Sequence, residues 1–237
     1  MSACVLVKDM RKPLDEFRSL EIARSIKQEI CLNLTKDEHV LTEATVAKRY
    51  NISRAPVRQI FQTLAHDRLV ELRPRVGTIV VPLERAKVIE YLQATTSLLR
   101  LAAENSEHPL PSDLKFQLFA IYAEAKDAQD THSADDLKLD VMISTTDKFL
   151  EVVADLIKDP IIRSALRAAW WRAARARCIQ ANQYPAFVWE RFVASIDAAV
   201  KVCDSKAAGS IFFEIATCFE ETGKRAVNQN ILPNQDA

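Results

Sequence analysis

The chain has 237 residues, and its 32 lysines and arginines balance its 32 aspartates and glutamates, so its formal net charge is zero. A hydrophobic content of 49% permits a sizeable core in one or two domains. No apolar run is long enough for a membrane span, and the N-terminus has its short apolar stretch before its charged residues, which is the reverse of a secretory signal. We therefore expect a cytoplasmic protein. The five cysteines contain no C-x-x-C pair, which argues against a disulfide framework or a zinc knuckle and is typical of reduced thiols.

The first predicted element is an amphipathic helix. Its apolar positions recur at helical spacing at Leu20, Ala23, Ile26 and Ile30. We expect this helix to end near Leu34, before a polar loop at residues 35–38.

Residues 41–81 predict two further short helices followed by a hairpin. Val46, Ala47 and Tyr50 would form the packing side of the first of these helices, leaving Lys48 and Arg49 free to approach phosphates. In the second helix the apolar residues lie at i, i+3, i+4 and i+7, at Val57, Ile60, Phe61 and Leu64.

The second helix also has a marked beginning and a polar stripe. Ser53 stands where an N-cap is expected, and Pro56 is tolerated because it lies in the first turn. Arg54, Arg58 and Gln62 are four residues apart and would lie beside the apolar face. An arginine at the N-terminal end of a helix in the major groove can donate two hydrogen bonds to guanine.

The hairpin is predicted from strands at Leu69 to Arg73 and Thr78 to Val81, with residues 74–77 turning between them. Gly77 is one of only three glycines in the chain, which makes its position in the turn informative. Residues 41–85 carry eight basic and four acidic side chains, whereas residues 86–237 carry 17 basic and 21 acidic ones. A basic module attached to an acidic one indicates that the N-terminal part meets a polyanion. The alternative for any single arginine is a solvated surface position.

The order of these elements is that of a winged helix-turn-helix. Residues 52–58, ISRAPVR, closely resemble the turn and recognition helix of the GntR family of bacterial transcriptional regulators, and Leu41, Glu43 and the wing residues 74–78 agree with it. The resemblance implies binding to double-stranded DNA as a homodimer on a short palindromic operator. The expected DNA-binding residues are Glu43, Lys48, Arg49, Ser53, Ala55, Pro56, Arg54, Arg58, Gln62, Arg73, Arg75 and Gly77.

After Pro82 the pattern becomes helical throughout. Six segments of helical length are separated by proline-containing or polar breaks: residues 84–106, 113–131, 134–157, 160–182, 186–203 and 205–228. Short connections between such segments favour an antiparallel bundle. We therefore predict a mainly α protein, with a winged helix-turn-helix domain at residues 1–83 and an all-helical, effector-binding and dimerisation domain at residues 84–237.

An all-helical domain behind a GntR-like head resembles the FadR subfamily and its effector-binding domain, FCD. Many FCD domains hold a divalent metal through one aspartate and three histidines. The corresponding positions here are Thr146, Leu150, Val193 and Glu214. Leucine and valine cannot replace imidazole ligands, so we expect no metal and no other cofactor. Asp147 and Glu151, one turn apart, could hold a cation weakly, although a solvated helix face explains them more simply.

Effector-binding candidates are the four positions of the lost metal site together with Tyr91 and Thr95, which occupy cavity-facing positions of the family. A second cluster is Trp171, Arg172 and Arg175, in a segment with five arginines. In a bundle cavity these residues would suit a carboxylate or phosphate. The simpler interpretation, which we prefer, places the tryptophans in the core and lets the arginines reach solvent or pair at a dimer interface.

These patterns lead to one functional hypothesis and two alternatives. The hypothesis is a transcriptional regulator, a repressor, whose operator binding is controlled by a small-molecule effector such as a carboxylate. One alternative is a constitutive or architectural DNA-binding protein whose helical domain only dimerises. The other is an enzyme in the bundle, but no cluster of nucleophile, acid and base is visible, so we predict no catalytic residues.

Overall fold

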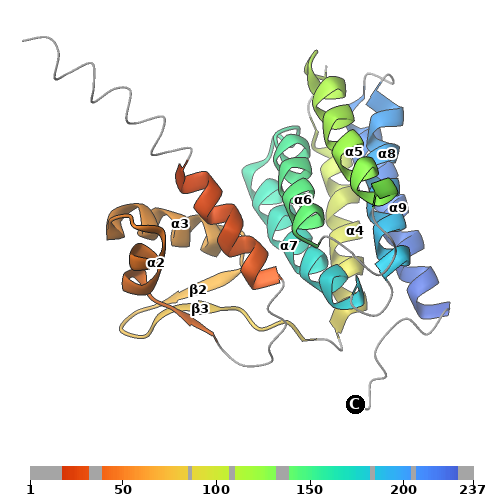
Figure 1. The fold of residues 1–237 in the computed structure, drawn as a ribbon. Coiled ribbons are helices and arrows are strands. Elements are labelled where there is room, and N and C mark those ends of the chain that lie inside the picture. The colour runs from red at the N-terminus through yellow and green to blue at the C-terminus, as the bar shows by residue number, and fades with distance from the viewer. Residues whose placement is uncertain are drawn as a thin grey trace, which may run out of the picture. The chain divides into compact units, whose positions relative to one another are not determined.

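The computed structural model describes residues 18–31, 39–84, 87–106, 110–131, 139–181, 185–203 and 207–228. The chain divides into two compact units, Met1–Pro82 and Leu83–Ala237 (Figure 1). The fold is mainly helical, with a small antiparallel sheet in the N-terminal unit, as the sequence predicts. No helix among the described residues is long and apolar enough to cross a membrane.

The three helices of the N-terminal unit lie at residues 18–31, at α2 (Glu43–Tyr50) and at α3 (Arg54–His66). Thr42 caps α2 by accepting a hydrogen bond from the Thr45 backbone N–H at 3.1 Å, and Asn51 ends α2 in the left-handed conformation, with φ of 51°. The four apolar residues predicted for α3 are all buried. In the first helix the expectation for Leu20 was wrong, because its side chain is 50% exposed and Ile22 is buried instead.

The sheet of the N-terminal unit has three strands in the order β1-β3-β2, all antiparallel. β2 (Val70–Arg73) and β3 (Gly77–Val80) form the predicted wing, with Arg73 opposite Gly77. β1 (Val40–Leu41) adds an edge strand that the sequence analysis missed. Its two residues are too few to show an alternating pattern, so pairing with β3 defines it.

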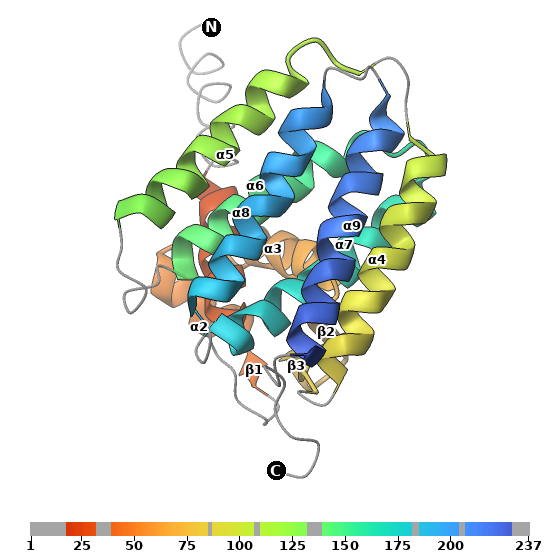
Figure 2. The same ribbon diagram turned by 90° about the vertical axis from the view of Figure 1, so that its right-hand side faces the viewer.

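The C-terminal unit consists of six helices among its described residues: α4 (Val88–Glu104), α5 (Leu114–Thr131), α6 (Leu139–Ala154), α7 (Pro160–Ala181), α8 (Pro185–Val202) and α9 (Ala208–Asn228). Five of the six predicted segments contain one of these helices, and the sixth, residues 186–203, begins one residue after the start of α8. Figure 2 shows α5, α8, α9 and α4 side by side, with α6 and α7 behind them. The first helix of the unit, α4, packs against the last, α9, and against α7.

Local signals explain why α7 begins at Pro160. The carboxylate of Asp159 accepts hydrogen bonds from the backbone N–H groups of Ile161 and Ile162 at 2.7 and 3.0 Å, and proline is well suited to the first turn of a helix. Further along α7, the ring centroid of Trp170 lies 5.7 Å from that of Phe149 on α6 and 5.3 Å from that of Phe219 on α9. This aromatic cluster joins three helices at the centre of the unit.

Candidate nucleic-acid interface and ligand-binding residues

The recognition helix α3 presents its polar stripe to solvent, because its opposite face is buried in the N-terminal unit. Arg54, Arg58 and Gln62 are all exposed. Ser53 occupies the N-cap position as predicted, but its side chain makes no capping hydrogen bond. Pro56 lies in the first turn, where no intrahelical donor is lost.

A groove of about 590 Å³ separates the recognition helix from the wing. It is lined by α3, by the start of α2 and by both sides of the hairpin. Six of the predicted DNA-binding residues line this groove: Glu43, Arg58, Gln62, Arg73, Arg75 and Gly77. Sequence reasoning missed Thr42, Phe61, Leu72, Val76 and Thr78 as groove residues, since their places follow from the hairpin's packing against α3.

One ion pair joins two of the residues that line the groove. The Nε atom of Arg58 donates a hydrogen bond to Oε1 of Glu43 at 2.7 Å. This hydrogen bond raises the pKa of the Arg58 guanidinium, so the side chain stays cationic. Glu43 therefore restrains the Arg58 side chain at the exposed surface of α3, which reduces the side-chain entropy that Arg58 would lose on contacting a base.

The wing supplies two more arginines. Arg73 donates hydrogen bonds to Glu71 at 3.1 and 3.2 Å, whereas Arg75 is exposed at the tip of the turn. Arg75 has a left-handed backbone, with φ of 65°, and Gly77 has φ of 124°, a conformation that disfavours any side chain. The predicted role of Gly77 in shaping the turn thus has a structural basis.

The remaining predicted DNA-binding residues lie outside the groove lining. Lys48 and Arg49 are exposed on α2, and Arg49 Nη1 donates a hydrogen bond to Glu29 at 2.9 Å. That hydrogen bond raises the pKa of Arg49. Ser53, Arg54 and Ala55 are exposed at the start of α3.

In the C-terminal unit, Thr95 and the residues at the family's metal positions belong mostly to the packed interior. Thr95 is fully buried and donates hydrogen bonds to the carbonyls of Tyr91 at 2.8 Å and Ala169 at 3.1 Å. Thr146 donates to the carbonyl of Met142 at 2.6 Å. Leu150 and Val193 are buried, and Glu214 and Tyr91 are partly buried. Within the described part of the chain, no group of three or more His, Cys, Asp or Glu could hold a metal ion.

The structure corrects two expectations about side-chain placement. Trp171 is buried, as the preferred interpretation expects, and Arg172 is exposed, but Arg175 is buried and does not reach solvent, so the three residues do not form one surface. Asp147 is only 3% exposed, so it does not belong to a solvated helix face. The reason for the burial of Arg175 is that α7 is buried on almost every side near its C-terminal end. Helical spacing alone cannot distinguish a buried face from an exposed face there.

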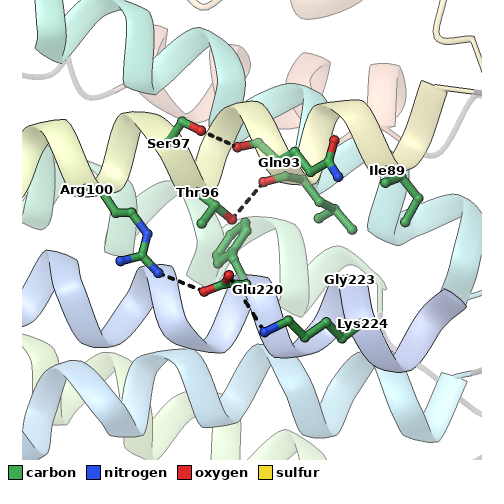
Figure 3. Close-up of a pocket in the computed structure, with 10 residues that line it drawn as sticks. Ile89, Gln93, Thr96, Ser97, Arg100, Glu220, Gly223 and Lys224 are labelled. Atoms are coloured by element: carbon green, nitrogen blue, oxygen red, sulfur yellow. Dashed lines mark hydrogen bonds and ion pairs between the residues drawn. The ribbon is translucent and has the colours of Figure 1, made fainter. Parts of the chain in front are cut away.

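A pocket of about 720 Å³ lies between α4 and α9. Its lining includes Gln93, Thr96, Arg100, Glu220 and Lys224, which Figure 3 shows projecting from the two helices. The Arg100 guanidinium lies 2.7 Å from the Glu220 carboxylate, and the Lys224 ammonium lies 3.8 Å from it. Tyr91 and Thr95 do not line this pocket; Thr95 points to α7 instead.

Arg177 on α7 is a charged residue that the sequence analysis did not single out. It is 4% exposed, and its Cζ atom lies 4.1 Å from the centre of the Phe219 ring. Burial lowers the pKa of its guanidinium to about 10. No sequence signal distinguishes Arg177 from the four other arginines of α7.

Comparison with known proteins supports the assignment of the N-terminal unit. Residues 18–80 match the family model described as bacterial regulatory proteins, gntR family. The chain is 24% identical over 152 residues to the gluconate operon transcriptional repressor of Bacillus subtilis, covering 61% of this chain and 62% of that protein. It is 35% identical over 68 residues to the HTH-type transcriptional repressor RspR of Escherichia coli, covering 29% of this chain and 30% of that protein. The chain thus spans less than two thirds of the length of either relative.

Solved structures extend the similarity in fold to about nine tenths of the chain. Escherichia coli McbR/YncC matches with a TM-score of 0.57 at 17% identity, covering 90% of this chain and 98% of that one. A GntR regulator from Rhodococcus sp. RHA1 matches with a TM-score of 0.51 at 18% identity, covering 89% and 98%. At these identities the matches concern the fold.

Proposed function

We propose that this chain, whose residues 18–80 match the family model of the GntR bacterial regulatory proteins, is a transcriptional repressor of that family that binds operator DNA in the cytoplasm. The observation that carries the proposal is the groove between α3 and the wing, with Arg58, Arg73 and Arg75 among its lining residues. A helix of this kind reads base edges in the major groove, while wing arginines contact phosphates. Two repressors among the relatives, those of the gluconate operon and RspR, support the choice of repression.

Within this proposal, the twelve predicted DNA-binding residues divide by position. Arg54, Arg58 and Gln62 on α3 would reach base edges, and Glu43 would restrain the Arg58 side chain through their hydrogen bond. The exposed cations of α2 and the wing would contact the backbone of the duplex. These roles agree with a basic module at residues 41–85.

We further propose that the protein acts as a homodimer. Two copies related by a two-fold axis would present two recognition helices to adjacent half-sites, so the operator would be a short palindrome. The helical unit, which we propose to be of the FCD type in the FadR subfamily, would join the copies and respond to a small-molecule effector. Its candidate ligand-binding residues remain those predicted from the sequence, with Trp171 and Arg175 in the interior and Arg172 at the surface.

Selection from a random DNA library tests the function directly. Purified full-length protein should enrich a short palindrome, and the double variant Arg54→Ala/Arg58→Ala should enrich none. Arg172→Ala is a matched control, because it removes one exposed arginine from the other unit and should leave the enriched sequence unchanged. Recovery of the same palindrome by the double variant would reject α3 as the reading helix, and failure of the wild-type chain to enrich any sequence would reject operator binding.

A further inference from the structure

Arg177 is a buried cation without a counter-ion. The side chain is 4% exposed, and its Nε and Nη2 atoms have no hydrogen-bond partner among the residues that the structure describes. No carboxylate in the described ranges forms an ion pair with it, and none contributes to the shift of its pKa. Leaving a charge buried and unpaired is costly in free energy, so such a group is rarely kept for stability alone.

The contact with Phe219 compensates for only part of this cost. The guanidinium lies against the face of the Phe219 ring at 4.1 Å, a favourable cation–π geometry. Burial lowers the pKa of Arg177 to about 10, so the side chain still carries its charge at neutral pH. The site is therefore a fixed positive charge in an environment of low polarity.

The two unpartnered nitrogens of Arg177 are adjacent in the covalent structure. Nε–H and Nη2–H project from the same edge of the planar guanidinium and are spaced for the two oxygens of a carboxylate. The cation–π contact with Phe219 leaves both of these nitrogens without a hydrogen-bond acceptor among the described residues.

Phe219 also connects Arg177 to a space that reaches solvent. It lines the 720 Å³ pocket between α4 and α9, whose other lining residues include Arg100 and Lys224. Both of these cations already lie beside Glu220, as Figure 3 shows. One carboxylate cannot neutralise two cations, so the pocket carries a net positive charge, and Arg177 adds a wholly uncompensated positive charge in contact with Phe219.

We propose that Arg177 is the effector's anchoring residue and that it binds a monocarboxylate through its Nε and Nη2 edge. This inference rests on the regulatory function proposed above. A single carboxylate matches the single charge, whereas a phosphate dianion would bring a second charge into the interior. The apolar body of the ligand would occupy the pocket beside Phe219. Because the edge is closed to solvent, binding has to displace side chains packed on it, which couples ligand binding to a change in the packing of α7 against α9.

Thermal unfolding of the full-length protein tests this proposal with defined probes. Hexanoate and benzoate should raise the melting temperature of the wild type in a concentration-dependent way, whereas hexanamide, benzamide and inorganic phosphate should not. Arg177→Met keeps the volume and removes the charge. It should unfold at a higher temperature than the ligand-free wild type and bind the better carboxylate about ten- to a hundredfold more weakly by calorimetry.

Lys201→Met is the control, because Lys201 on α8 is an exposed cation of the same unit and is not a candidate ligand-binding residue; it should respond to the carboxylates as the wild type does. Equal effects of the acids and their amides on the wild type would overturn the proposal, and this comparison needs no variant. Unchanged carboxylate affinity in Arg177→Met, or stabilisation by phosphate alone, would also overturn it. Library selection with Arg177→Met reports separately on DNA binding, which should persist, so loss of the effector site is distinguishable from failure of the proposed function.

Discussion

Lys27 and Asp67 form a buried ion pair that joins the first helix to the end of the recognition helix. The Lys27 Nζ atom lies 3.0 Å from Oδ2 of Asp67, and the two side chains are 4% and 0% exposed. Asp67 is the C-cap residue of α3, directly after its last residue, His66. The pair therefore links the base of the N-terminal unit to the helix that we propose reads DNA.

Removal of one partner of this pair should destabilise the N-terminal unit. Lys27→Met leaves the Asp67 carboxylate buried without its cation, and we expect a loss of about 3 to 5 kcal/mol in the free energy of unfolding. Lys27→Met/Asp67→Leu removes both charges and should recover a large part of that loss. Urea denaturation measures both variants, and a double variant as unstable as Lys27→Met would show that another contact of Asp67 dominates.

Arg58→Ala should weaken binding to the selected operator about ten- to a hundredfold and relax the preference at one guanine. The reason is the position of Arg58 on the exposed stripe of α3, where Glu43 restrains it. Glu43→Gln keeps the size of the side chain and removes its charge. It should reduce affinity less than Arg58→Ala without changing base preference, as measured by fluorescence anisotropy on operators with single substitutions. Unchanged preference in Arg58→Ala would assign base reading to other residues.

Arg75 in the wing should contribute affinity without sequence preference. We choose Arg75→Asn because φ is 65° at this position and asparagine tolerates the left-handed conformation. Binding should weaken evenly across sequences, and the slope of log affinity against log salt should fall by about one, as expected for the loss of one phosphate contact. Titrations at several salt concentrations measure the slope; an identical slope in the variant would exclude a phosphate contact.

Gly209 permits the close approach of α9 to the end of α4. A Cβ atom at this position would lie 2.6 Å from the backbone oxygen of Ala103, which is too close for any contact. Gly209→Ala should therefore cost about 1 to 3 kcal/mol of stability. The matched control is Gly223→Ala on the same helix, where an added Cβ meets nothing within 4 Å and should stabilise by about 0.5 to 1 kcal/mol. Equal effects of both changes in calorimetry would contradict this packing.

Metal removal should leave the protein unchanged. The residues at the family's metal positions include Leu150 and Val193, which have no donor atoms, and the hydroxyl of Thr146 is engaged with the carbonyl of Met142. Protein purified without chelator should contain substoichiometric zinc, nickel and manganese, and EDTA should not alter its melting temperature. One tightly held metal ion per chain by elemental analysis would show that other residues form a site.

The sequence alone predicts much of the N-terminal unit because its signals are local. The apolar spacing of Val57, Ile60, Phe61 and Leu64 predicts the buried face of α3, and the glycine at position 77 predicts the turn of the wing. The groove residues Arg58, Arg73 and Arg75 were likewise predicted, because a short helix and a hairpin constrain where their exposed side chains lie. In the C-terminal unit the same periodicity predicts each helical segment.

Only the tertiary structure decides which helices meet and which charges they enclose. β1 is defined by pairing with β3, and α4 packs against α9, more than a hundred residues later in the chain. Local patterns carry no information on such distant partners. The five arginines of α7 look alike in the sequence, yet Arg172 is exposed and Arg177 is buried. The physical reason is that the C-terminal half of α7 is enclosed by its neighbours, so burial there depends on the packing of the other helices and not on helical period.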